Sequence, residues 1–340
     1  TYDVDRHEWR YDVGGFAWDN AELGTDAALW YAFLRSGDPL AFRVARAMTQ
    51  HVSEVDTHHS GRFAGLGCRH AVVHWGDGAK EARVSESFTK RFSYYLTADE
   101  LLGDLMRNAL RVDRTLLTVE PLREVLPPQD KAPTRLRIGP DWYALVSNWL
   151  TEWERTGDTH WRDLITTGMR DIASLPAGLF TGEAGGAVGF DPDTGHLINL
   201  EKGDFEAEVE QHLPEFRQVL LDFCRYVQAP AAEKIARYGR DFNPGAFKTI
   251  YSRMTAWAGE QLDEPAIRAR GWEQFTSDPN GRPWPDPVPV GGNAVPTPVD
   301  EIPIGANNPS GDFASVATND AAQRTLAIIS LLAIAPAEAP

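Results

Sequence analysis

The feature that most constrains the fold of this 340-residue chain is a helical hairpin that recurs at a nearly constant interval. Gly37 follows one predicted helix and can end it, while Asp38 and Pro39 suit the cap and the first turn of the next helix. Similar turns come at Asp99 and Asp158, which lie 61 and 59 residues after the preceding turn aspartate. A recurrence of this size is typical of a fold built from helical pairs.

The hydrophobic pattern extends this repeat along most of the chain. Predicted helices alternate short connections with long ones, and eleven helices nearly complete six hairpins. We therefore expect an all-α fold, an (α/α)6 toroid, with residues 1–340 as a single domain. The predicted helical segments are 19–34, 40–55, 88–96, 101–117, 142–153, 161–173, 214–227, 231–238, 247–262, 264–275 and 316–334.

Four connections between hairpins are long: 57–80, 118–139, 175–203 and 277–311. In a toroid of alternating inner and outer helices, every outer-to-inner link lies at the same end, so these loops are expected to share one rim. Long loops in a compact domain are usually functional. The rim also collects the N-termini of the inner helices, whose free N–H groups favour anions. The sequence therefore predicts a site for a negatively charged ligand at this rim.

The charge of the chain narrows the class of ligand. A formal net charge of −16 argues against broad binding of nucleic acid or anionic membranes, and no apolar run is long enough to span a bilayer. Against this acidic background, the loop that starts at Thr57 is locally basic. It contains His58, His59, His70, His74, Arg62, Arg69, Lys80 and Arg83. Such a cluster indicates a specific anionic partner, and we expect an acidic polysaccharide or oligosaccharide.

The residues of this loop suit elimination chemistry on a uronic acid. Arg69, Arg83 or Lys80 can neutralise the sugar carboxylate and acidify the neighbouring C–H, and His70 or His74 can then remove that proton. Packing of the loop is the structural alternative for these side chains. The chemistry needs no cofactor, although a divalent cation stays an open alternative. Zinc held by His70 and His74 is a rival interpretation that the glycine-bounded, β-branched segment does not favour.

A proton donor for the leaving oxygen is expected from a tyrosine. Tyr143, close to the predicted rim, and Tyr94 are the candidates, although tyrosines on inner helices are more often part of the core. Aromatic faces suit sugar rings, and polar side chains beside the rim can bind hydroxyl groups. Candidate substrate contacts of both kinds are Trp18, Asp19, Asn20, Trp75, Trp142, Arg62 and Glu81.

Two stretches of sequence resemble a known family. The block RHAVVHWGDGAKEARVSESFTKRFSYYLTADELLGDLM, within 57–106, and the stretch WRYDVGGFAWDNAELGTD near the start are similar to the C-terminal α/α-toroid domain of exo-rhamnogalacturonan lyase-like proteins, polysaccharide lyase family 26. The resemblance implies cleavage of the galacturonic acid–rhamnose bond by β-elimination. It also implies β-rich domains ahead of the toroid in the same polypeptide. A polymeric substrate in turn suggests a secreted or extracytoplasmic protein, with a cytoplasmic one as the alternative.

Other functions remain open at this point. A glycoside hydrolase on the same toroid would act on unsaturated uronic sugars, with Asp19, Glu81 or Glu183 as the acid, and would form no new double bond. A non-catalytic carbohydrate-binding module is a second alternative, and a sugar epimerase with paired histidines is a third. Cys68 and Cys224, the two cysteines, are expected as buried thiols, with one bridge as the alternative.

Overall fold

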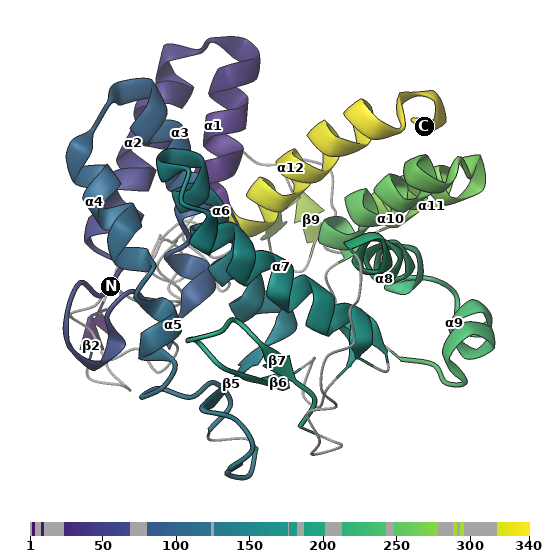
Figure 1. Ribbon diagram of the computed structural model, residues 1–340. Coiled ribbons are helices and arrows are strands. Elements are labelled where there is room, and N and C mark those ends of the chain that lie inside the picture. The colour runs from purple at the N-terminus through teal and green to yellow at the C-terminus, as the bar shows by residue number, and fades with distance from the viewer. Residues whose placement is uncertain are drawn as a thin grey trace.

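Helices dominate the computed structural model and are arranged around a common centre (Figure 1). The structure describes residues 2–3, 8–9, 24–68, 80–123, 126–175, 177–181, 187–200, 213–242, 248–277, 288–290, 293–295 and 318–340. The helices are α1 (Thr25–Ser36), α2 (Pro39–Glu54), α3 (Ser87–Thr97), α4 (Glu100–Ala109), α5 (Val112–Thr115), α6 (Tyr143–Thr156), α7 (Thr159–Ser174), α8 (Leu213–Tyr226), α9 (Ala231–Tyr238), α10 (Lys248–Leu262), α11 (Pro265–Thr276) and α12 (Thr318–Ile334).

The turn aspartates cap the second helix of three hairpins, as predicted. The side chain of Asp38 accepts a hydrogen bond of 2.8 Å from the N–H of Leu40, and Asp158 accepts one of 2.9 Å from His160. Asp99 caps α4 in the same way. Each cap satisfies an N–H group that has no partner within its helix. Short local signals therefore set the boundaries of these hairpins.

The hairpins close into a ring. The inner helices are α1, α3, α6, α8, α10 and α12. Helix α12 packs against both α1 and α10, α1 packs against α3, and α3 packs against α6. Between α6 and α8 the ring continues through α7, which contacts both. This arrangement confirms the predicted α/α toroid, and the eleven described helices of eight or more residues match the predicted segments.

Small antiparallel sheets in the loops are an addition that the all-α prediction omitted. Strand β5 (Thr134–Arg137) pairs with β6 (Ala187–Phe190), which pairs with β7 (Leu197–Ile198). The second and third long connections supply these strands, so the two loops lie at the same rim, as expected. The other short strands are β1 (Tyr2–Asp3) with β2 (Glu8–Trp9), β3 (Gly67–Cys68) with β4 (Lys80–Glu81), and β8 (Val288–Val290) with β9 (Asn293–Val295).

The inner helices bury both apolar and polar side chains. The largest apolar cluster includes Leu145, Trp149 and Ile172 from α6 and α7, packed with Leu136 and Phe190 of the rim sheet. The inner helices also bury many polar side chains, among them Ser87, Thr89, Lys90 and Ser93 on α3, Ser147, Asn148 and Thr151 on α6, and Ser252 and Thr255 on α10. Buried polar groups need hydrogen-bond partners. The inner helices therefore carry polar groups as well as apolar side chains toward the interior of the ring.

Two further expectations concern the state of the cysteines and the presence of a membrane-spanning helix. Cys68 and Cys224 are both buried and unbridged, which confirms the expectation of two buried thiols. Burial also raises the pKa of Cys224 to about 12. Within the described residues, no helix combines the length and the apolar character needed to cross a bilayer.

Candidate functional site

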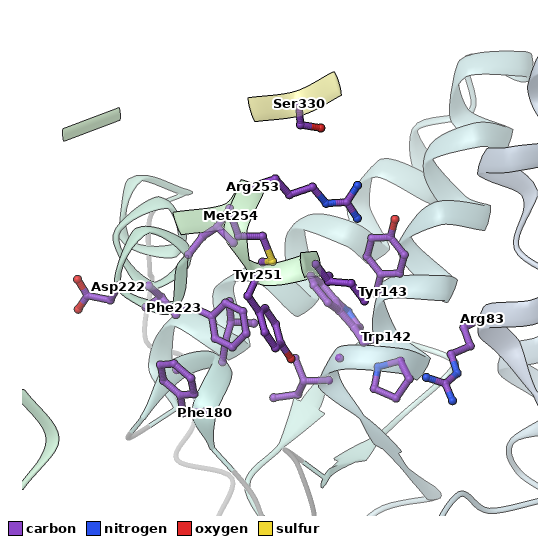
Figure 2. Close-up of a pocket in the computed structure, with 18 of the residues that line it drawn as sticks. Arg83, Trp142, Tyr143, Phe180, Asp222, Phe223, Tyr251, Arg253, Met254 and Ser330 are labelled. Carbon is purple, nitrogen blue, oxygen red and sulfur yellow. The ribbon is translucent and has the colours of Figure 1, made fainter. Parts of the chain in front are cut away.

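A cavity of about 1600 Å³ lies at the N-terminal end of the inner helices (Figure 2). Each inner helix contributes a side chain from its first two turns to the cavity wall. These side chains are Ala27 of α1, Thr89 of α3, Tyr143 of α6, Phe216 of α8, Tyr251 of α10 and Gln323 of α12. The rim predicted to bind an anionic ligand therefore has a hollow larger than the clefts of about 300–1,000 Å³ that hold small molecules.

Tyr143 of α6 and Arg253 of α10 both line the cavity. Figure 2 shows the phenol of Tyr143 and the guanidinium of Arg253 pointing toward each other. Nη2 of Arg253 donates a hydrogen bond of 3.3 Å to Oε1 of Gln323. Burial lowers the pKa of Arg253, and the neighbouring Tyr143 and Tyr31 act against that shift. A guanidinium stays protonated under such conditions, so it places a positive charge beside the phenol.

Glu86 faces the same cavity from the start of α3. It is the residue that precedes the helix, yet its side chain does not cap it. The N–H groups of Ser87 and Phe88 donate instead to Oδ1 of Asn148 and Oγ of Ser147, at 2.7 and 3.1 Å. The Glu86 side chain is thus left to line the cavity with 8% exposure, and its Oε2 has no hydrogen-bond partner among the described residues.

The ionisation of Glu86 and Tyr143 is linked. Burial, and then the charge of Asp26, raise the pKa of Glu86 to about 8. The charge of Glu86 raises the pKa of Tyr143 above its ordinary value. Both groups are therefore protonated at neutral pH, and both can donate a proton to a bound molecule.

A buried charge network lies behind Glu86. Lys90, one turn further along α3, is 1% exposed, and its Nζ donates to the carbonyl oxygens of Ser85 and Glu86. Burial lowers the pKa of Lys90 to about 8, and the carboxylates of Asp26, Glu86 and Asp56 act against that shift. Burial raises the pKa of Asp26, which is fully inaccessible. Buried charges of this kind persist only when they are paired.

Arg83 reaches the cavity from the rim. It belongs to a 3-10 turn (Ala82–Val84) that directly follows β4, and its Nε donates to Oε2 of Glu81. Glu81 also lies 4.0 Å from Nη1 of Arg137, which in turn bonds both carboxylate oxygens of Asp141. The carboxylate of Glu81 therefore holds Arg83 in place at the edge of the cavity.

Comparison with known proteins places this toroid in a family. Residues 1–340 match the family described as "PcRGLX-like protein C-terminal alpha/alpha toroid domain". The chain belongs to the PcRGLX-like C-terminal toroid family. A relative from Bacillus subtilis (strain 168), named "Uncharacterized protein YetA", is 39% identical over 296 residues, which is 82% of this chain and 34% of the relative. The chain thus spans about a third of that protein, and the family resemblance expected from the sequence is confirmed.

In this PcRGLX-like toroid, three of the predicted site residues line the cavity: Tyr143, Trp142 and Arg83. Three other described candidates lie elsewhere. Glu81 is buried behind Arg83. Arg62 is exposed on a 3-10 turn (Gly61–Phe63), with its guanidinium over the ring of Phe63.

Tyr94, the alternative proton donor, is in the last turn of α3, at the opposite end of this helix from Glu86. It packs on Gly103 of α4 and under the guanidinium of Arg155, which lies 4.8 Å from the ring centroid. It does not line the cavity of the PcRGLX-like toroid as far as the described residues show.

The remaining candidates belong to segments other than those described. Trp18, Asp19, Asn20, Arg69, His70, His74, Trp75 and Glu183 lie outside the described residues. So does the side chain of Lys80, whose backbone pairs with Cys68 in the β3–β4 ladder. The histidines His58 and His59 are described, and they contact Cys68 Sγ and the Glu54 carbonyl oxygen respectively.

Sequence reasoning missed Asp26, Lys90 and Arg253 as part of this site, and it did not single out Glu86. One signal was present. Glu86 and Lys90 are one turn apart on a helix whose buried face is otherwise composed of Ser87, Thr89 and Ser93. A charged pair among small polar residues on a buried face indicates a helix that faces a polar cavity rather than an apolar core.

Proposed function

We propose that this toroid is the catalytic domain of a polysaccharide lyase that cleaves a uronic-acid-containing, rhamnogalacturonan-like polysaccharide by β-elimination. The observation that supports this most directly is that Tyr143, Glu86 and Arg253 all line the central cavity, with the Tyr143 phenol and the Arg253 guanidinium pointing toward each other. An acid beside a fixed positive charge is the combination that elimination from a uronate needs.

The first requirement is to neutralise the substrate carboxylate. Arg253 and Arg83 both line the cavity, and an arginine can bind a carboxylate with two parallel hydrogen bonds. Withdrawal of charge from the carboxylate acidifies the C5–H bond, because the negative charge that develops on proton removal is delocalised toward that group. In this proposal Arg253 acts from α10 and Arg83 from the rim, with Arg69 and Lys80 as further candidates.

The second requirement is a proton donor for the leaving oxygen. Tyr143 is the better of the two predicted tyrosines, because it lines the cavity and Tyr94 packs between α3, α4 and Arg155. Its raised pKa keeps the phenol protonated until the bond breaks. Arg253 then stabilises the phenolate that remains.

The third requirement is a base for the C5 proton, and His70 or His74 remains our proposal. The segment that contains them joins β3 to β4, and the turn after β4 brings Arg83 to the cavity. An imidazole accepts a proton near neutral pH without further activation. No step of this scheme uses a cofactor. The proposed partners are the acidic saccharide and other domains of the same polypeptide, in a secreted or extracytoplasmic protein.

A glycoside hydrolase is the second candidate, and one observation favours it. Glu86 has a pKa of about 8 and so resembles the protonated acid of a glycosidase. Such an enzyme also needs a second carboxylate across the sugar. Asp222 is the other carboxylate among the described cavity residues, and its position at the aromatic end of the cavity is shown in Figure 2.

One incubation tests these alternatives. The full-length protein is mixed with rhamnogalacturonan, and the products are followed by ultraviolet absorbance and by mass. A lyase forms an unsaturated uronic residue that absorbs in the ultraviolet, with no added water. A hydrolase adds one water per bond and gives no absorbance, and this result would replace the lyase proposal. Binding without any product would indicate a carbohydrate-binding module.

A further inference from the structure

The starting observation is that Glu86 occupies a helix-capping position without capping. Asn148 and Ser147 of α6 accept the hydrogen bonds from the first N–H groups of α3. The carboxyl group is consequently directed to the cavity, and one of its oxygens has no hydrogen-bond partner among the described residues. A buried polar atom without a partner is costly, so its presence beside a cavity indicates a role with a bound molecule or a neighbouring group.

The register of α6 places Tyr143 next to this carboxyl group. Ser147, which contacts both the Phe88 N–H and the Glu86 carboxyl group, is four residues after Tyr143. Residues four apart lie on the same face of a helix, and their side chains lean toward its N-terminus. Tyr143 is therefore one turn nearer the rim than the contact with Glu86, and the charge of Glu86 is the largest influence on its phenol.

We propose that Glu86 and Tyr143 form a proton relay in which the Glu86 carboxyl group returns a proton to the Tyr143 oxygen after each turnover. The inference rests on the proposed function of Tyr143 as the donor to the leaving oxygen. Tyr143 gives its proton to that oxygen as the C–O bond breaks, and the resulting phenolate takes the proton of Glu86. The Glu86 carboxylate then regains a proton from water, while the base releases the C5 proton to water. One proton leaves the substrate and one is added, so the cycle balances.

The surrounding charges favour this direction of transfer. The pKa of Glu86, about 8, is below that of the Tyr143 phenol, so a phenolate takes the proton from the carboxyl group spontaneously. On the other side of Glu86, Lys90 offers a buried positive charge to the carboxylate formed. Among the described residues, charged or titratable groups around the pair include Asp26 and Tyr31 of α1, Arg253 of α10, Arg83 of the rim, and Asp56 with His51 behind Lys90.

The test compares Glu86→Gln with wild type in the full-length protein. Glutamine keeps the size and the hydrogen-bonding shape but holds no transferable proton. We expect kcat to fall at least about tenfold at pH 7, since general-acid steps contribute factors of about 10²–10⁴ and solvent can replace a relay in part. KM should change less than twofold. The wild-type kcat should fall as pH rises through about 8. This decrease should be absent from the pH profile of the variant.

Infrared spectroscopy supplies a readout that does not depend on activity. The difference spectrum, wild type minus Glu86→Gln, should show a protonated-carboxyl band that is lost as pH rises through about 8. Asp26 and Asp56, whose pKa values are also raised, are present in both proteins and cancel in this difference. Lys90 also has a pKa of about 8 but contains no carboxyl group, so the band separates the two residues. Glu86→Asp, which retains an acid, should keep the band and part of the rate.

The matched control is Glu152→Gln. Glu152 is equally buried, but it pairs with Arg155 at 2.8 Å, near the other end of α6. Its removal should leave the pH profile and the band unchanged. Wild-type kcat and pH profile in Glu86→Gln, or a difference spectrum without the band, would overturn the relay. If the wild-type protein forms no unsaturated product, the proposed function is wrong, whereas the infrared band still decides whether Glu86 holds the proton.

Discussion

The N–H of Ser87 donates a hydrogen bond of 2.7 Å to Oδ1 of Asn148, which ties the start of α3 to the middle of α6. The Nδ2 of Asn148 also donates to the carbonyl oxygen of Ala109, at the end of α4, at 3.1 Å. One buried amide thus joins three helices, and Ser147 beside it accepts from the Phe88 N–H, a donor that the side chain of Glu86 could otherwise cap. Both contacts fix the start of α3, and with it the position of Glu86 at the cavity.

Asn148→Ala should therefore destabilise the fold and disturb the site. The change leaves the Ser87 N–H and the Ala109 carbonyl without their partner, and each buried unsatisfied group costs about 1–3 kcal/mol. We expect the free energy of unfolding, measured by urea denaturation, to fall by about 2–4 kcal/mol. Arg162→Ala, which removes an exposed ion pair with Asp163, should change it by less than about 1 kcal/mol. Equal effects of the two changes would contradict this account of Asn148.

Tyr143→Phe should abolish most of the proposed lyase activity. The substitution removes only the phenolic oxygen, so binding should persist while kcat falls by about 10²–10⁴. Tyr94→Phe is the matched control, because Tyr94 packs against Gly103 and Arg155 rather than in the cavity. The rate of ultraviolet product formation measures both variants. A larger loss in Tyr94→Phe than in Tyr143→Phe would reverse the assignment of the donor.

Arg253→Gln should reduce kcat/KM for a uronate substrate by about 10²–10³, the range found when one stabilising donor is removed from a developing negative charge. The loss should be smaller on a substrate whose carboxylates are methyl-esterified, because that substrate has no charge to neutralise. Arg253→Lys should recover part of the activity, since it restores the charge but not the planar geometry. Arg217→Gln, on the exposed face of α8, serves as the control. The same loss on both substrates would argue against neutralisation of the carboxylate.

The stability of the fold should depend on pH through Glu86. The pKa of this group is about 8 in the fold against a usual 4.5, so between these values the folded protein binds more protons than the unfolded chain. Stability is therefore greatest below about pH 4.5 for this group and falls as pH rises toward 8, by at most about 1.4 kcal/mol per pH unit for one proton. Lys90, whose pKa is lowered to about 8, acts in the opposite direction at higher pH.

Urea midpoints between pH 5 and 9 measure this dependence. Glu86→Gln should reduce the decrease in stability between pH 5 and 8. Glu152→Gln should leave this decrease unchanged. Part of the decrease in stability should persist in Glu86→Gln, because burial also raises the pKa values of Asp26 and Asp56. An unchanged slope in Glu86→Gln would show that Glu86 titrates normally in the fold.

Several features of the fold could be predicted because they depend on neighbours in the chain. Gly37 takes the left-handed conformation that ends α1, and Asp38 caps α2, within three consecutive residues. The same holds for Gly157 and Asp158 between α6 and α7. The short rim strands were missed, because β5 and β6 pair residues that are about fifty positions apart, which no local pattern reveals.

The candidate site could be predicted only in part. Tyr143 was identified because it follows a long loop at the start of an inner helix, and Arg83 because it belongs to a cationic cluster. Tyr94 looked equivalent in the sequence, yet it lies at the other end of its helix. Arg253 has no distinguishing neighbours in the chain, and it becomes significant only beside Tyr143.

By itself, the sequence determined that this protein is a ring of helical hairpins with long loops at one end, since periodicity, caps and turns act over a few residues. The tertiary structure alone decided which side chains meet: Glu86, Tyr143 and Arg253 come from three helices that are far apart in the chain. Their pKa values and their possible chemistry arise from burial and from charges a few ångströms away. Those distances exist only after the ring has closed.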